Sequence, residues 1–228
     1  MKKKKIKNPL IRRIPKELIG DWKKYLVVFL FLVLTIGFVS GMYVANESMI
    51  TSASEGVTKY KQEDGHFELK KQADATLLSA IETGEKADFK ATKTTLYENF
   101  FRNEEEDYNN DGKKDGTIRV FAKTKDINLA CMLQGSFPQK ADEIAIDRMH
   151  ADNVGIKVGD TVTVSGETYK VVGLLAYVNY STLHEKTTDL MFDALKFDVA
   201  MVTQDGFDRL HKSIHYTYAW KYETEPAD

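Results

Sequence analysis

One polar stretch of the chain has the residue types and the spacing of a calcium-binding loop. Asp107, Asn109 and Asp111 are two residues apart, and Gly112 and Asp115 follow them. These offsets match positions 1, 3, 5, 6 and 9 of a loop in which oxygen atoms surround a hard cation and a glycine permits the sharp bend. Asp107, Asn109, Asp111 and Asp115 are therefore candidate ligands for Ca²⁺.

The end of this loop departs from the calcium pattern. Its twelfth position is Ile118, where a calcium loop places a bidentate glutamate. Strands rather than helices are predicted on both sides, and Asn, Asp and Gly are also common in solvated hairpin turns. Two interpretations stay open: a calcium site of modest affinity, or a hairpin loop that binds no ion.

Other residues that could do chemistry lack the partners that the chemistry requires. His211 and His215 are four residues apart and could share a helix face, but no cysteine or carboxylate completes a zinc motif with them. No pair of acidic residues has the spacing of a general acid and base. The motifs G-x-x-x-x-G-K-[ST], G-x-G-x-x-G and G-x-S-x-G are absent from the sequence. We therefore predict that the chain is not an enzyme and carries no cofactor, apart from the calcium ion considered above.

The first element that the sequence predicts is an apolar run, Tyr25 to Ala45, which contains no charged residue. As a helix it is about 31 Å long, which matches the hydrocarbon core of a bilayer. The run therefore predicts a transmembrane helix over residues 25–45. A cleaved signal peptide is the alternative, but the basic region and the apolar run are both too long for one, and the sequence before residue 46 is a poor cleavage site.

The charge is distributed unequally around this run. Residues 1–24 contain ten basic and two acidic residues, whereas the rest of the chain contains 22 basic and 32 acidic residues. Positively charged flanks stay in the cytoplasm. We therefore expect a plasma-membrane protein that crosses the bilayer once, with a cytoplasmic N-terminus and an extracytoplasmic bulk. A basic arm this short, beside an apolar run, does not indicate nucleic-acid binding.

The basic segment 1–24 has its own apolar pattern, in which Ile11, Ile14, Leu18 and Trp22 recur at helical spacing. Such a helix would lie on the inner leaflet, where its basic residues contact anionic lipid. An ordinary positive flank with no further role is an equal alternative. Within the membrane helix, Gly37, Gly41 and Ala45 are four residues apart, a spacing that lets two helix backbones approach closely. A packing partner would be a further transmembrane segment outside this chain.

The rest of the chain predicts a helical stalk over 46–64 and a mixed domain over 65–228. Apolar residues at helical spacing extend to Val57, and Gly65 ends this pattern. A helix is expected at 73–84, with Leu77, Leu78 and Ile81 as its buried stripe, and a shorter one at 205–214. Strands are expected at 66–70, 94–100, 117–123, 142–147, 160–164, 168–175, 197–203 and 216–222. Strands and helices without a regular βαβ rhythm indicate an α+β fold.

The part of this domain from 142 to 174 has a recognisable order of motifs. It contains the acidic-aliphatic strand EIAI at 143–146, then GIKVGD at 155–160, then alternating Val162 and Val164, and last YKVVGL at 169–174. This order resembles the extracytoplasmic core domain of the FtsX/MacB-like ABC transporter permeases. The basic arm and the single N-terminal membrane helix agree with the layout of that family.

The resemblance implies a role in which the chain works with other subunits. Permeases of this family contact a separate cytosolic ATPase through an N-terminal amphipathic helix, here the segment with Ile11, Ile14, Leu18 and Trp22. Their stalk carries movement to the outer domain, which handles a substrate outside. Further membrane helices normally follow the outer domain, whereas this sequence ends at Asp228 without another apolar run. We therefore expect an N-terminal part or a truncated form of such a permease. A free-standing, membrane-anchored binding protein is the main alternative, and an anchored hydrolase is a weaker one.

Overall fold

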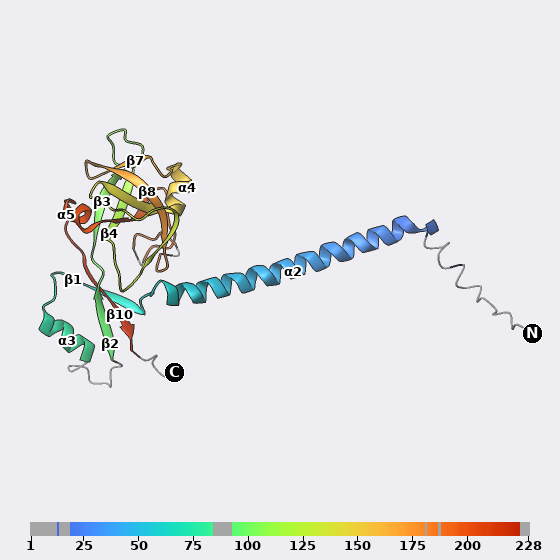
Figure 1. Ribbon diagram of the computed structural model, residues 1–228, viewed down its shortest axis with the longest axis horizontal. Helices are drawn as coiled ribbons and strands as arrows, with labels where there is room; N and C mark the ends of the chain where they lie inside the picture. Colours follow the sequence, from blue (N-terminus) through green and yellow to red (C-terminus); the bar gives the residue numbers. More distant parts are fainter. Residues whose placement is uncertain (1–12, 14–18, 84–92, 181, 187, 224–228) are drawn as a thin grey trace, which may run out of the picture. The chain divides into compact units, whose positions relative to one another are not determined.

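The structure is a computed structural model that describes residues 13, 19–83, 93–180, 182–186 and 188–223. The chain divides into two compact units, Met1–Ser54 and Glu55–Asp228. The predicted fold class is confirmed, because one long apolar N-terminal helix is followed by a domain of mixed strands and helices (Figure 1).

The long helix is α2, Trp22–Lys59, and it contains the whole predicted membrane span. Its continuity follows from its composition, since no proline or glycine pair interrupts 38 residues. Among the described residues it is the one helix that is long and apolar enough to cross a membrane, and none of its side chains is buried. Its apolar side chains are therefore available to lipid or to other helices. The helix continues past the span, through Ser54, into the second unit.

The second unit contains a small antiparallel sheet in the order β1-β10-β2. Its strands are β1 (Gly65–Leu69), β10 (Tyr216–Tyr222) and β2 (Thr94–Glu98). The helix α3 (Ala75–Thr83) lies against β2 (Figure 1). The predicted buried stripe of this helix is wrong in part: Leu77 is 43% exposed, and none of the residues of α3 is buried. A helix that packs only on a small edge strand leaves most of its surface in solvent.

The larger sheet of the second unit has seven strands in the order β5-β8-β6-β9-β4-β3-β7. The long strand β8 also pairs with β7, so the ring of pairings closes into a barrel with β5 attached outside the ring. Two pairs, β4–β9 and β6–β8, are parallel, and the others are antiparallel. The strands are β3 (Phe101–Asp107), β4 (Gly116–Ala122), β5 (Ala130–Gly135), β6 (Glu143–Asp147), β7 (Thr161–Val164), β8 (Glu167–Tyr177) and β9 (Phe197–Val202).

Two short helices flank the barrel (Figure 1). The first, α4 (Arg148–Val154), begins where the side chain of Asp147 accepts bonds from backbone N–H groups, and it ends at Gly155, whose φ of 84° suits glycine. The second, α5 (Gln204–Asp208), is shorter than the predicted helix 205–214. His211 and His215 therefore do not share a helix face.

The core consists of alternating residues of the barrel strands. Val162, Val164, Tyr169 and Val171 of the β7–β8 hairpin are all at most 1% exposed, which confirms the predicted apolar face of this hairpin. Burying side chains of this size stabilises the fold by roughly 1.5–3 kcal/mol each. Their positions make the hairpin a packing element of the barrel.

Candidate functional site

The end of α2 is tied into the second unit by a group of residues that we call the joint, residues 60–63 together with residues 128–131. The helix closes with a reversal in which the Gln62 N–H donates to the Val57 carbonyl (3.0 Å) and the Lys61 N–H donates to the Thr58 carbonyl (3.3 Å). Lys61 has a φ of 49°. This pattern satisfies the last carbonyl groups of the helix and turns the chain sharply toward β1.

Two backbone hydrogen bonds hold this turn to the segment that precedes β5. The Leu129 N–H donates to the Tyr60 carbonyl (2.8 Å), and the Asn128 N–H donates to the Lys61 carbonyl (3.0 Å). A third contact joins side chains, because the Tyr60 hydroxyl donates to the Cys131 thiol at 2.8 Å. The first residues after the helix are therefore bonded at two points to the loop before β5 and at a third point to β5 itself.

The centre of the joint is the side chain of Asn128, which is 1% exposed. Its amide oxygen accepts from the Glu63 N–H (3.0 Å), and its amide nitrogen donates to a carboxylate oxygen of Glu63 (2.6 Å). The φ of Asn128 is 47°, a conformation that asparagine tolerates better than most residues. The buried side chain of Asn128 thus binds both the backbone and the carboxylate of Glu63, four residues after the last residue of α2.

Charged groups surround the joint on the side of the small sheet. The other carboxylate oxygen of Glu63 lies 2.7 Å from His66 Nδ1, and this hydrogen bond raises the pKa of His66 despite its partial burial. The Lys221 ammonium donates to the Gln62 carbonyl (2.8 Å) and pairs with Asp64 (3.6 Å). The joint is therefore bonded to β10 as well as to the barrel.

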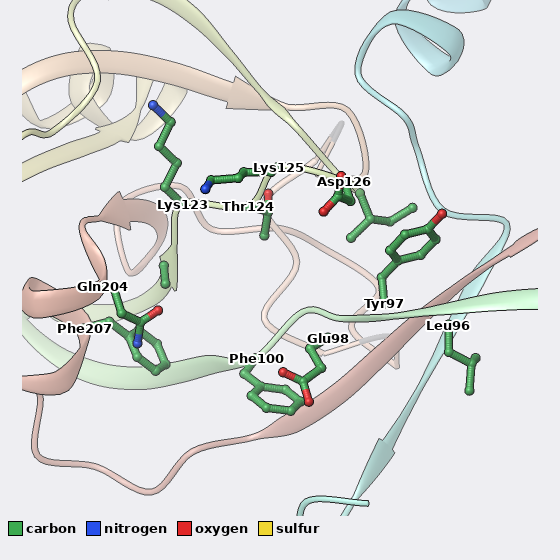
Figure 2. Close-up of a pocket in the computed structure, with 12 residues that line it drawn as sticks. Leu96, Tyr97, Glu98, Phe100, Lys123, Thr124, Lys125, Asp126, Gln204 and Phe207 are labelled. Carbon is green, nitrogen blue, oxygen red and sulfur yellow. The ribbon is translucent and has the colours of Figure 1, made fainter. Parts of the chain in front are cut away.

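A cleft of about 430 Å³ lies beside the joint. The loop 123–127, which precedes Asn128, lines one side of it, and Glu98, Phe100 and Tyr97 line the other (Figure 2). Gln204 and Phe207 of α5 complete its wall. The cleft therefore separates the end of the small sheet from the loop that holds the helix end.

The comparisons with known proteins give similarities of fold only. No family model matches the chain, and no curated protein matches its sequence. One similar solved structure is the extracellular domain of the ABC-type transporter YknZ from Gram-positive bacteria, with 13% identity, a TM-score of 0.38, and coverage of 71% of this chain and 85% of that one. Another is the periplasmic region of MacB from Actinobacillus actinomycetemcomitans, with 8% identity, a TM-score of 0.38, and coverage of 64% and 65%.

The predicted calcium ligands lie in the loop between β3 and β4. One carboxylate oxygen of Asp107 accepts from the Gly112 N–H (2.8 Å) and the other from the Asp111 N–H (3.1 Å). The Asn109 amide oxygen also accepts from the Asp111 N–H (2.9 Å), and Asp115 accepts from the Tyr108 N–H (3.2 Å). The structure brings the four residues into one hydrogen-bonded loop, and calcium binding stays a prediction.

The residues predicted for partner contacts lie on or before α2. Ile11, Ile14 and Leu18 fall outside the described residues. Trp22 is the first residue of α2 and is 55% exposed. Gly37, Gly41 and Ala45 lie within α2. Apart from adjacent residues and the nearby backbone of α2 itself, no described part of the chain comes within 4 Å of a methyl group added at either glycine. Their roles in ATPase contact and helix packing stay predictions.

The joint was not identified from the sequence. Asn128 stands in a polar stretch, 65 residues away from its partner Glu63. No local motif links two residues so far apart, since only the path of the chain through β4 brings the loop back to the helix end. The change from helical spacing to the strand at 66–70 was the one available sign that a structural transition occurs near Glu63.

Proposed function

We propose that this chain is the N-terminal part, or a truncated form, of an FtsX/MacB-like ABC transporter permease subunit. In this role α2 crosses the membrane, the second unit lies outside the cell, and a separate cytosolic ATPase drives extracytoplasmic work such as export or substrate handling. Neither unit has a catalytic role of its own. The partners are the ATPase, further transmembrane segments of the permease and the lipid membrane.

The observation that carries this proposal is the joint at the end of a continuous helix. A flexible linker would suffice to tether a binding domain to a membrane, because such a domain must only stay nearby. Here the helix runs without interruption from the span to Lys59, and its end is fixed by at least five hydrogen bonds around Asn128, Tyr60 and Glu63. A helix bonded in this way passes displacement to the domain.

The single cysteine of the chain gives a direct test of this coupling. Cys131 accepts the Tyr60 hydroxyl at the joint and is partly exposed, so its rate of reaction with a maleimide reports whether this contact opens. The chain should be co-purified with its ATPase, placed in lipid nanodiscs, and labelled with and without ATP. We expect a change of several-fold in the labelling rate when ATP is added.

Three variants test the coupling from the ATPase to the joint. Ser52→Pro breaks α2 between the span and the joint, because proline removes a helix hydrogen bond and clashes with the preceding turn. It should keep the ATPase bound and abolish the response of Cys131 to ATP. Leu18→Ala with Trp22→Ala should reduce co-purification of the ATPase, whereas Tyr43→Ala, at the other end of the span, should not. An ATP response that persists with Ser52→Pro, or a chain that retains no ATPase, would contradict the proposal and favour a free-standing anchored protein.

A further inference from the structure

Three side chains that can be charged meet inside the barrel, at the end covered by α4. Glu106 of β3 and Asp198 of β9 are both 0% exposed, and so is His150 of α4. The strand pairings explain their direction: Asp198 pairs with Ile118 of the core, and Glu106 lies two residues along β3 from Glu104, which pairs with the same Ile118. Side chains of paired residues share one face of a sheet, so both carboxylates point into the barrel.

The three side chains present a compact set of donor atoms. One atom from each lies within 4.8 Å of the others, and His150 Nε2 is 3.4 Å from a carboxylate oxygen of Glu106. Among the described residues, four buried atoms make no hydrogen bond of ordinary geometry: both carboxylate oxygens of Glu106, Oδ2 of Asp198 and Nε2 of His150, of which the last is within ion-pair distance of Glu106. Buried polar atoms almost always have a partner, so these four atoms in one place point to an ion bound between them or to protons shared within the cluster.

The neighbouring backbone fixes the direction of these free atoms. The other oxygen of Asp198, Oδ1, accepts from the Val199 N–H (2.6 Å) and the Asp147 N–H (3.3 Å). His150 Nδ1 lies 2.7 Å from the Ala194 carbonyl, which can only accept, so Nδ1 carries the proton and Nε2 faces the carboxylates. A ring nitrogen oriented by a carbonyl in this way is the usual arrangement of a metal-ligating histidine.

Two arrangements balance the buried charges of this cluster. In one, His150 and one carboxylate each hold a proton, because an isolated buried carboxylate takes up a proton rather than stay charged. In the other, a divalent cation neutralises both carboxylates while the imidazole stays neutral. Two ligands of a tetrahedral zinc ion lie about 3.3 Å apart. His150 Nε2 and a Glu106 oxygen are 3.4 Å apart, and the donor atom of Asp198 lies within 4.8 Å of the other two.

The nearby residue Glu104 shows what a buried carboxylate with ordinary partners looks like in this fold. It is 1% exposed, but one of its oxygens accepts from the Lys212 N–H (2.9 Å) and the other accepts from the Ser165 hydroxyl. Among the described residues, neither oxygen of Glu106 accepts from a backbone N–H or a hydroxyl in this way.

We propose that Glu106, His150 and Asp198 form a buried site for a divalent transition-metal ion of the Zn²⁺ type. Imidazole with carboxylate oxygens is a ligand set that such ions accept, and both oxygens of Glu106 are free to supply a third and a fourth donor. The ion would connect β3, β9 and α4 at one end of the barrel. Because the ligand atoms are enclosed, it would be bound as the barrel folds and would resist removal by chelators.

The test is the metal content of the full chain. The protein should be expressed in medium supplemented with Zn²⁺, or in parallel with Mn²⁺, purified in detergent, dialysed against a chelator and analysed by elemental mass spectrometry. We expect close to one metal ion per chain. Protein loaded with Co²⁺ in place of Zn²⁺ should show visible ligand-field absorption bands. When the protein is refolded with Zn²⁺ at a hundred times its Kd, the midpoint temperature of unfolding should be about 5–10 °C higher than without Zn²⁺.

Variants of the cluster, with the neighbouring Glu104 as the control, test the assignment of the ligands. Glu106→Gln and His150→Gln should reduce the metal content below about a tenth of the wild-type value and remove the cobalt bands, whereas Glu104→Gln should retain both. Two results together would overturn the proposal. The wild-type chain would contain less than about a tenth of an equivalent of either metal, and Glu106→Gln would be more stable than the wild type in the absence of zinc. The cluster would then be a group of protonated and ion-paired side chains. Wild-type metal content is informative even where a variant does not fold.

Discussion

At the scale of single residues, the most sensitive position of the joint is Asn128. Asn128→Ala should destabilise the second unit by about 2–4 kcal/mol. The buried Glu63 carboxylate and N–H lose their partner, which costs roughly 1–3 kcal/mol, and alanine at a φ of 47° adds about 1 kcal/mol. Chemical denaturation of the full chain in detergent measures the effect.

Two control substitutions divide this cost into its parts. Asn128→Gly removes the same hydrogen bonds without the backbone strain, so it should cost about 1 kcal/mol less than alanine. Asn153→Ala removes the side chain of an exposed asparagine on α4 and should change stability by no more than about 0.5 kcal/mol. Equal effects at Asn128 and Asn153 would mean that the joint does not stabilise the domain.

His66 gives the joint a dependence on pH. The hydrogen bond with Glu63 raises the pKa of His66 above its ordinary value of 6.5, so the folded state binds this proton more tightly than the unfolded state does. The stabilisation is complete below about pH 6.5 and disappears as the pH rises through the raised pKa. Because the ring is about half exposed, we expect less than about 1 kcal/mol.

Thermal unfolding between pH 5.5 and pH 9 tests this expectation. The difference between wild type and His66→Gln should be largest at the acidic end, should shrink as the pH rises, and should become smaller in high salt. His211→Gln, at an exposed position, is the matched control. A pH profile that is identical in wild type and His66→Gln would refute the assignment.

At the scale of elements, the turn that follows α2 places a lysine in a backbone conformation that favours glycine. Lys61 has a φ of 49°, which costs a non-glycine residue roughly 1 kcal/mol. Its contacts with the Lys125 carbonyl (3.3 Å) and Asp126 (3.9 Å) are exposed and contribute little. Lys61→Gly should therefore stabilise the chain by about 0.5–1 kcal/mol.

A second lysine in the same turn provides a control with the opposite sign. Lys59 is the last helical residue of α2, where glycine is less favourable than lysine by roughly 0.5–1 kcal/mol. The denaturation midpoint should therefore be higher than that of the wild type for Lys61→Gly and lower for Lys59→Gly. If Lys61→Gly also destabilises, the reversal at residues 57–62 does not form as described.

The elements also show which parts of the fold a sequence can reveal. The length of an uncharged apolar run predicted the membrane helix, and the alternation of apolar and polar residues predicted the β7–β8 hairpin. The strand β3, whose last four residues are acidic, was not predicted, since its inward Glu104 and Glu106 look like a solvated run until the barrel closes around them. The cluster with His150 and Asp198 depends on that closure, and the spacing of its members along the chain carries no signal.

At the scale of the whole molecule, the proposed permease function requires that the two ends of α2 lie on opposite sides of a membrane. To test this orientation, Cys131 should be replaced by serine and one new cysteine introduced. The new cysteine lies either in the basic arm, as Lys5→Cys, or at an exposed position of α5, as Asp205→Cys. In intact cells, a membrane-impermeant maleimide should label Asp205→Cys and should label Lys5→Cys only after permeabilisation. The excess of lysine and arginine in residues 1–24 is the physical reason for this orientation, because moving such charges across the bilayer is unfavourable.

The mass of the mature product distinguishes a permanent span from a cleaved signal peptide, since cleavage would remove the basic arm and release the domain. Labelling of Lys5→Cys in intact cells, or a product without the arm, would leave α2 no role as a transmembrane coupling element.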